Sequence, residues 1–84
     1  MQQYSVYILC CVDGTLYTGV TTDVWQRFLE HERGVGAKYT RTHKPLQIVY
    51  QEKAGTRSDA QQREAVIKKM TRAQKLGLIK RSKK

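Results

Sequence analysis

Five polar side chains have types and spacings that make them candidates for a catalytic site: Tyr7, Tyr17, Arg27, His31 and Glu64. The planar guanidinium of an arginine offers a fork of donors to a phosphate or a carboxylate. An imidazole titrates near neutral pH and can relay a proton or orient a neighbouring group. A carboxylate can hold a hard divalent cation. The set indicates chemistry on an anionic group, provided that the fold brings these residues together.

The two tyrosines lie on segments that the sequence predicts to be the strands of a hairpin. Residues 4–12 are almost wholly apolar and rich in β-formers, which predicts a strand buried on both faces and therefore central in its sheet. Asp13-Gly14 is typical of a turn, and residues 15–20 form a second β-rich run. The register of this hairpin decides whether the tyrosines share a face.

Turn chemistry alone leaves two registers open. A two-residue loop at 13–14 sends the tyrosines to opposite faces of the hairpin. A three-residue loop at 12–14, with Gly14 left-handed in a bulge, places Tyr7 opposite Gly19 and both tyrosines on one face. A working site needs the second register, so we predict the three-residue loop with Gly14 at positive φ.

The arginine and the histidine fall on a predicted helix that Thr22 or Asp23 can cap and that runs to about Arg33. Arg27 and His31 are four residues apart and therefore stack on one side of this helix. They lie on the border of its apolar arc, where a polar head can reach into a cleft. The arc that we expect in the core consists of Val24, Trp25, Phe28 and Leu29.

Between this helix and the glutamate we expect a loop and a third strand. Residues 34–44 hold two glycines and three basic residues and predict a loop, which Pro45 ends. Residues 46–51 are β-rich and predict the strand.

The glutamate lies on a second predicted helix over about 59–71, which a capping box at 58–61 would start. Glu64 borders its inner arc, and residues 72–80 predict another helical turn or two, broken near Gly77. The inner arc consists of Ala60, Val66, Ile67 and Met70. The order strand, strand, helix, strand, helix, with this further helical segment, predicts a small α+β fold with a three-stranded, mainly antiparallel sheet flanked by helices.

Composition narrows the class of protein. With 84 residues, 39% of them hydrophobic and 27% charged, the chain is expected to be one folded domain. It has no apolar run near the ~20 residues of a membrane helix and no visible signal peptide, so we expect a cytoplasmic protein that contacts no membrane. Cys10 and Cys11 are adjacent, and we expect packed thiols rather than a disulfide or zinc ligands.

The net charge of +9 is concentrated near the C-terminus. Residues 65–84 carry eight basic side chains and no acidic one. Such a segment matches a polyanion, most often nucleic acid, and a solubilising tail is the alternative. We therefore expect a domain over residues 1–75 and a basic C-terminal tail over 76–84.

The motifs around the candidate residues resemble those of the GIY-YIG nuclease superfamily. Its name-giving motifs appear as Ser5-Val6-Tyr7 and Tyr17-Thr18-Gly19, followed by an arginine and a histidine one turn apart and by a glutamate on a later helix. The resemblance covers about residues 4–70 and is closest to small stand-alone bacterial members of the UPF0213 type. The sequence string 36–41 also resembles the sequence of the catalytic subunit of structure-specific junction endonucleases. An asparagine of many active members and a second DNA-recognition domain have no match.

The resemblance implies the GIY-YIG fold and a metal-dependent endonuclease that cleaves phosphodiester bonds in DNA. It implies that Glu64 is the single metal ligand, which suits weakly bound Mg²⁺ or Mn²⁺. It favours Tyr17 as the base that activates water and Tyr7 as the residue that positions water or phosphate, with an exchange of these roles left open. Arg27 would hold the scissile phosphate, and His31 would relay a proton or orient a tyrosine.

Each of these residues also has an ordinary structural interpretation. Glu64 and Lys68 have the spacing of a surface ion pair, and Arg27 can simply face solvent. His31 lies near a helix C-terminus, where the helix dipole favours it, and the tyrosines can be sheet residues that only pack. Glu64 is the single carboxylate that we expect at the cleft, since Glu30 is expected to lie away from the arginine.

We expect the nucleic acid to be held mainly through its phosphates. Gly19 would leave open space above the sheet for the phosphate backbone, and Tyr39 would place a ring among the cations of the basic loop, as suits a splayed or single strand. A merely mobile basic loop is the alternative. The predicted contact residues are Gly19, Lys38, Tyr39, Arg41, Lys44, Lys68, Lys69 and Arg72.

Two function classes stay open. The first is an endonuclease acting on DNA, including branched or damaged DNA of the kind met in DNA repair. The second is a nucleic-acid-binding module without turnover, acting with a protein partner that supplies substrate specificity. DNA is the expected ligand, and RNA stays open. Intact Arg27 and Glu64 favour the enzyme, whereas the missing asparagine and the missing second domain favour the binding module.

Overall fold

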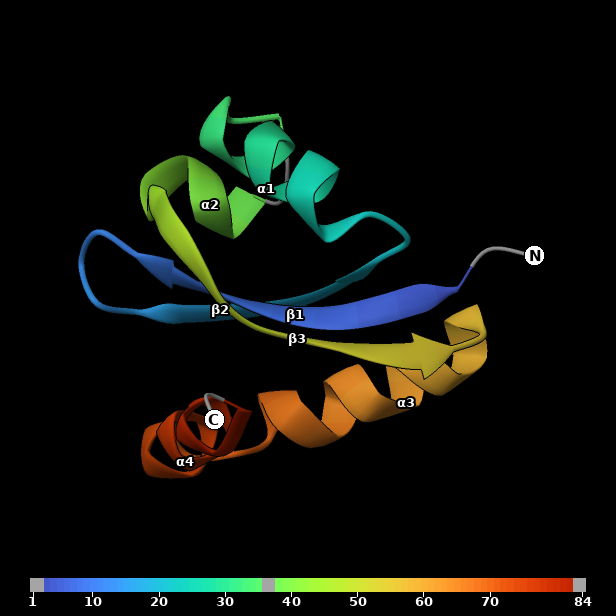
Figure 1. Ribbon diagram of the computed structural model, residues 1–84. Helices are drawn as coiled ribbons and strands as arrows, with labels where there is room; N and C mark the ends of the chain where they lie inside the picture. Colours follow the sequence, from blue (N-terminus) through green and yellow to red (C-terminus); the bar gives the residue numbers. More distant parts are fainter. Residues whose placement is uncertain (1–2, 36–37, 83–84) are drawn as a thin grey trace.

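A three-stranded antiparallel sheet divides the protein into two helical layers (Figure 1). The computed structural model describes residues 3–35 and 38–82. The strands are β1 (Tyr4–Cys11), β2 (Leu16–Thr21) and β3 (Pro45–Gly55), in the spatial order β2-β1-β3. Helices α1 (Val24–Glu32) and α2 (Lys38–Thr42) cover one face, and α3 (Arg57–Lys68) and α4 (Arg72–Ser82) cover the other. The α+β prediction is confirmed.

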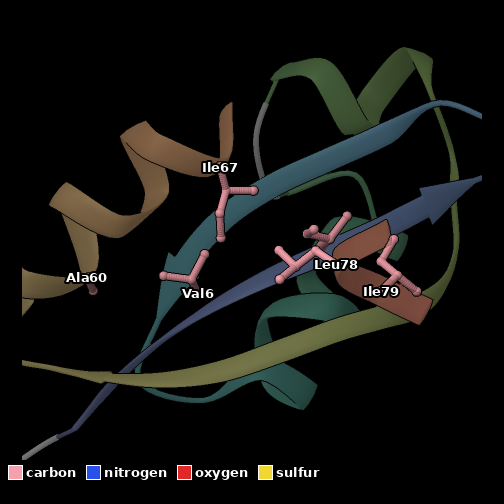
Figure 2. Packing of buried hydrophobic residues seen from close by; sticks show 6 residues of the cluster. Val6, Ala60, Ile67, Leu78 and Ile79 are labelled. Carbon is pink, nitrogen blue, oxygen red and sulfur yellow. The ribbon is translucent and has the colours of Figure 1, made fainter. Parts of the chain in front are cut away.

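The alternating side chains of β1 build a separate core on each face of the sheet. Val6 and Ile8 point toward α3 and α4, whereas Tyr7 and Leu9 point toward α1. Figure 2 shows part of the first core; its buried members are Val6, Ile8, Ala60, Ile67, Leu78 and Ile79. The second core consists of Tyr7, Leu9, Val24 and Phe28. This two-sided burial explains why β1 is the central strand and why its sequence is almost continuously apolar.

The hairpin has the predicted three-residue loop. The amide of Cys11 donates to the carbonyl of Thr15 over 2.9 Å, and Gly14 has φ 84°. Only a residue without Cβ adopts that φ at low cost. Tyr7 therefore lies opposite Gly19, and the two tyrosines share the face that α1 covers.

The helix boundaries differ from the sequence expectations at two places. The loop expected at 34–44 contains the five-residue helix α2. The capping box of α3 is formed by Thr56 and Asp59, two residues before the expected one at 58–61. Its cause is Gly55, whose φ of 91° ends β3 and turns the chain directly into the helix.

Residues 76–82 belong to the packed domain. The boundary expected after residue 75 falls inside α4, which continues through Gly77 without a break. Leu78 and Ile79, on the C-terminal half of this helix, are buried in the first core (Figure 2). The density of lysine and arginine around these two apolar residues hides their packing role in the sequence.

Two residues expected in the core are exposed. The side chain of Trp25 is 62% exposed and stacks on Phe28, with ring centroids 5.6 Å apart. Val66 is also exposed, because it lies about 100° around α3 from the buried Ile67. Cys10 and Cys11 are free thiols, as expected. Among the described residues, no helix combines the length and the apolar character needed to cross a membrane.

Replacing Thr18 with valine is expected to stabilise the protein by about 1 kcal/mol. Thr18 is 3% exposed and lies opposite Ile8, and its hydroxyl has no hydrogen-bond partner among the described residues. Valine has the same shape without the buried polar group. Urea unfolding followed by circular dichroism measures the change, with Thr22→Val at an exposed position as the control. A midpoint that falls below that of the control variant would contradict the assignment.

Candidate active site

Three of the five predicted catalytic residues form one aromatic cluster between β1, β2 and α1. The ring centroids of Tyr7 and Tyr17 are 6.4 Å apart, and each ring also contacts His31, at 6.1 and 5.2 Å. The hairpin register supplies the two tyrosines, and α1 supplies the histidine from its inner side, where it is fully buried. A histidine of this kind cannot be an ordinary surface residue of a helix end.

The hydroxyl of Tyr7 is held at the centre of this cluster. It lies 2.8 Å from Nε2 of His31, and the side chain is only 1% exposed. A Cβ placed on Gly19 would lie 2.5 Å from the same hydroxyl. The space above Gly19, which we expected to admit a phosphate backbone, is therefore filled by Tyr7. The glycine serves the site by letting the hydroxyl end of the tyrosine ring approach β2 closely.

The electrostatics of the cluster keep Tyr7 and His31 neutral at neutral pH. Burial raises the pKa of Tyr7, and the nearby Tyr17 and Glu64 raise it further, while the positively charged Arg27 acts in the opposite direction. Burial and the charge of Arg27 lower the pKa of His31. Neutral Tyr7 can donate one proton, and neutral His31 can accept one.

Arg27 reaches the same cluster from α1. Its guanidinium is near enough to Tyr7 to lower the pKa of the phenol, and its side chain is 35% exposed, so part of its donors face solvent. Nη1 also lies 2.9 Å from Oε1 of Glu30, which corrects the expectation that Glu30 lies away from the arginine. The cause is their i,i+3 spacing on one helix face. This ion pair raises the pKa of Arg27, and the nearby Tyr7 raises it further.

Glu64 lies on α3, in the other helical layer, but acts on the cluster through its charge. Its side chain is 20% exposed, and Oε2 lies 3.4 Å from Nζ of Lys68. The ordinary i,i+4 ion pair considered from the sequence is therefore present. The negative charge is also near enough to raise the pKa of Tyr7. Within residues 3–35 and 38–82, no group of three or more histidines, cysteines or acidic residues is placed to hold a metal.

Helix α2 forms a wall of the site that the sequence did not indicate. Oγ1 of Thr40 lies 2.7 Å from Nδ1 of His31, on the side of the ring opposite Tyr7, and Thr40 is buried. The ring of Tyr39 stacks on both Tyr17 and His43, with centroids 5.6 and 4.2 Å apart. Tyr39 therefore packs against protein rings, where we had expected it to stack on nucleic-acid bases. The sequence predicted a loop for this segment, so there was no helical periodicity from which to place Thr40 on the side that faces His31.

The hairpin loop anchors the end of α2. Oδ2 of Asp13 lies 2.6 Å from Nδ1 of His43, and the amide of Val12 donates to the carbonyl of Lys44. Hydrogen bonds from Thr15 and then from His43 lower the pKa of Asp13 to about 2. Two segments thirty residues apart in the sequence are thereby joined at the edge of the site.

The predicted phosphate-binding residues divide between the two layers. Lys38 and Lys44 are exposed at the two ends of α2, beside the aromatic cluster. In the other layer, Lys68 pairs with Glu64, Lys69 is exposed, and Nη1 of Arg72 donates to the carbonyl of Gly14 over 2.7 Å. The prediction for the side chain of Arg41 falls outside what the structure describes, as does that for residues 36–37.

Residues 3–77 match the profile of the GIY-YIG catalytic domain. The chain belongs to the GIY-YIG family. This is a family of nuclease catalytic domains, so the resemblance carried by the motifs at 5–7 and 17–19 is confirmed.

Relatives and solved structures place the chain among small stand-alone GIY-YIG proteins. A UPF0213 protein of Staphylococcus saprophyticus is 47% identical over 79 residues, covering 94% of this chain and 96% of that protein. One of Staphylococcus aureus is 51% identical over 80 residues, covering 95% and 98%. The NMR structure of a UPF0213 protein from Bacillus halodurans has a TM-score of 0.59 at 40% identity, covering 93% and 83%. An Enterococcus faecalis protein, also solved by NMR, has a TM-score of 0.64 at 41% identity, covering 95% and 85%.

Proposed function

We propose that this GIY-YIG domain is an endonuclease that cleaves phosphodiester bonds in DNA with the help of a divalent cation. The observation that supports it most directly is the contact of the buried Tyr7 hydroxyl with Nε2 of His31, in a cluster where Arg27 is near enough to lower the pKa of the phenol. A proton-transfer pair thus lies beside a cation that can bind phosphate. A tyrosine that only packs in a sheet needs neither partner.

Arg27 would bind the scissile phosphate. A guanidinium offers five N–H donors in a plane, and this one uses part of them on Glu30. A phosphate held by the remaining donors would lie near the Tyr7 hydroxyl, because the charge of Arg27 is near enough to lower the pKa of that phenol. Holding the phosphate next to the reacting hydroxyl in this way supplies the proximity and orientation that account for a large part of catalysis.

Tyr7 and His31 would activate the attacking water. Nε2 of His31 takes the proton of Tyr7, and the phenolate so formed takes a proton from the attacking water. The water oxygen bonds to phosphorus while the bond from phosphorus to the leaving ester oxygen breaks, and that oxygen takes a proton from solvent. The use of Tyr7 as the base is the exchange of roles that the sequence left open. It is favoured because the Tyr7 hydroxyl touches a neutral imidazole, whereas no described residue is hydrogen-bonded to the hydroxyl of Tyr17. Tyr17 would keep His31 and Tyr39 in place by ring contacts.

The residues present fit a hard cation held by one carboxylate. Glu64 would hold Mg²⁺ or Mn²⁺ weakly, with waters and phosphate oxygens completing the coordination. Such a cation supplies positive charge for the negative charge that develops on the phosphate. The contact with Lys68 at 3.4 Å competes for the same carboxylate, which agrees with weak binding before the substrate arrives.

A nucleic-acid-binding module without turnover is the second candidate. The observation that favours it is that Arg27 and Glu64 each form an ion pair within their own helix, with Glu30 and Lys68. In that case a partner protein would supply the substrate specificity and the cut.

Cleavage assays with Mg²⁺ or Mn²⁺ separate the two candidates. The substrates are duplex, single-stranded, flap and junction DNA, together with RNA of the same sequence. Cleavage of DNA that EDTA stops and that Arg27→Ala weakens would support the enzyme, with branched forms expected among the better substrates. Binding of all forms with no cleavage by either metal would support the binding module.

The affinity for DNA is expected to depend steeply on salt and little on sequence. Lys80 and Arg81 are exposed on α4 and have no acidic partner among the described residues. The double variant Lys80→Gln, Arg81→Gln is expected to reduce the slope of log affinity against log salt by about two. Lys53→Gln with Arg57→Gln makes the same charge change on β3 and α3 and should alter the slope less. Equal slopes in the two double variants would show that α4 contacts no phosphate.

A further inference from the structure

We infer that Thr40 is a positioning residue that fixes the tautomer of His31. In this tautomer the proton is on Nδ1, and the unprotonated Nε2 can accept the proton of Tyr7. Thr40 lies within the string 36–41 but was not among the predicted site residues, and it comes from the short helix α2 rather than from the strands or from α1. The inference concerns the ground state of the cluster, and its catalytic consequence rests on the proposed function.

The first step is the direction of the hydrogen bond between Tyr7 and His31. The two atoms are 2.8 Å apart, so one of them donates to the other. The Tyr7 side chain is only 1% exposed, and its hydroxyl forms no other hydrogen bond to the described residues. The single proton of the buried, neutral phenol must go to an acceptor, and Nε2 of His31 lies at hydrogen-bonding distance. Nε2 is then unprotonated.

The second step follows from the chemistry of a neutral imidazole, which carries one proton on one of its two nitrogens. With Nε2 unprotonated, the proton is on Nδ1. Nδ1 lies 2.7 Å from Oγ1 of Thr40, so Nδ1–H donates to the hydroxyl oxygen. His31 is fully buried and Thr40 is 2% exposed, so bulk water is poorly placed to replace this acceptor. The hydrogen bond at one nitrogen sets the protonation of the other.

The third step is the support of Thr40 itself. Tyr39 stacks on Tyr17 and on His43, and His43 is bonded to Asp13 of the hairpin loop. These contacts hold α2 against the cluster on both sides of Thr40. The hairpin loop thereby reaches the His31 ring through α2, without touching any of the proposed catalytic groups.

Nitrogen-15 NMR of the histidine side chains tests the inference without any cleavage assay. The chain has two histidines, His31 and His43, so the signals can be assigned with the single variant His43→Asn. At neutral pH the wild-type His31 is expected to carry its proton on Nδ1. Thr40→Val, which removes the acceptor and keeps the shape, is expected to move a substantial fraction of His31 to the Nε2–H form. Thr40→Ser restores the hydroxyl and should restore the Nδ1–H form.

Thr42→Val is the matched control on the same helix. Thr42 is exposed, and its hydroxyl donates to the backbone of Tyr39 rather than to His31. It should leave the His31 tautomer unchanged. A wild-type spectrum with the proton on Nε2 would overturn the inference, as would a Thr40→Val spectrum identical to that of the wild type. The wild-type spectrum decides the matter even if Thr40→Val does not fold.

Cleavage rates then test the proposed function separately. Thr40→Val is expected to lower kcat by about tenfold or more with little change in KM. The reason is that Nε2 of His31 would no longer accept the proton of Tyr7, whereas phosphate binding by Arg27 would be kept. Thr40→Ser should recover most of the rate. A protein with the expected tautomers that cuts no substrate would contradict the endonuclease and leave the tautomer assignment standing.

Discussion

Replacing Glu64 with glutamine is expected to lower metal-dependent cleavage by on the order of 100-fold or more while DNA affinity stays equal or rises. Glutamine keeps the shape of the side chain and removes the charge that attracts a hard cation. The loss of one negative charge from a strongly basic protein favours binding of the polyanion. Cleavage and binding are measured at one salt concentration, after circular dichroism has confirmed folding.

The Glu64→Gln variant also distinguishes metal binding by Glu64 from an indirect effect of its charge on Tyr7. That charge raises the pKa of Tyr7, so its removal should make the phenol easier to deprotonate. If Glu64 acted only through Tyr7, Glu64→Gln would cleave at an equal or higher rate. A large loss therefore indicates the cation. Glu32→Gln, at an exposed position of α1, makes the same charge change and should cleave normally; equal rates in wild type and Glu64→Gln would contradict the metal assignment.

Replacing Gly19 with alanine is expected to lower cleavage by on the order of 100-fold and to destabilise the fold by about 1–3 kcal/mol. The added Cβ would lie 2.5 Å from the Tyr7 hydroxyl and 2.7 Å from the ring carbon that bears it. Tyr7 is buried and hydrogen-bonded, so its ring cannot swing into solvent. It has to move away from β2, which breaks its alignment with His31. Urea unfolding and initial cleavage rates measure the two effects.

Gly77→Ala is the matched control for the added methyl group. A Cβ at Gly77 would meet nothing within 4 Å, and the residue lies inside α4. Alanine there is expected to stabilise the protein by about 0.5–1 kcal/mol and to leave cleavage unchanged. If Gly19→Ala cleaves as fast as Gly77→Ala, the position of the Tyr7 hydroxyl does not matter to the reaction, and the proposed proton-transfer pair fails.

The sequence by itself determined the parts of the site that depend on local pattern. The continuous apolar run predicted the central strand β1. Gly14 permitted the bulged loop that places both tyrosines on one face, although turn chemistry alone also permitted the register that separates them. The cap at Asp23 and the four-residue spacing predicted Arg27 and His31 on one side of α1. These features are decided by residues a few positions apart, through turn chemistry, capping and the periods of strands and helices.

The tertiary structure alone decided which groups these side chains meet. Thr40 contacts His31, Tyr39 packs on Tyr17, and Tyr7 fills the space above Gly19. Each of these contacts joins segments at least nine residues apart, and α2 itself is too short to be stable without packing. The same reason explains α4, which forms because Leu78 and Ile79 find the core prepared by β1 and α3. A local pattern can place a side chain on a face, but the neighbours that set its proton, its pKa and its exposure come from the packing of the whole chain.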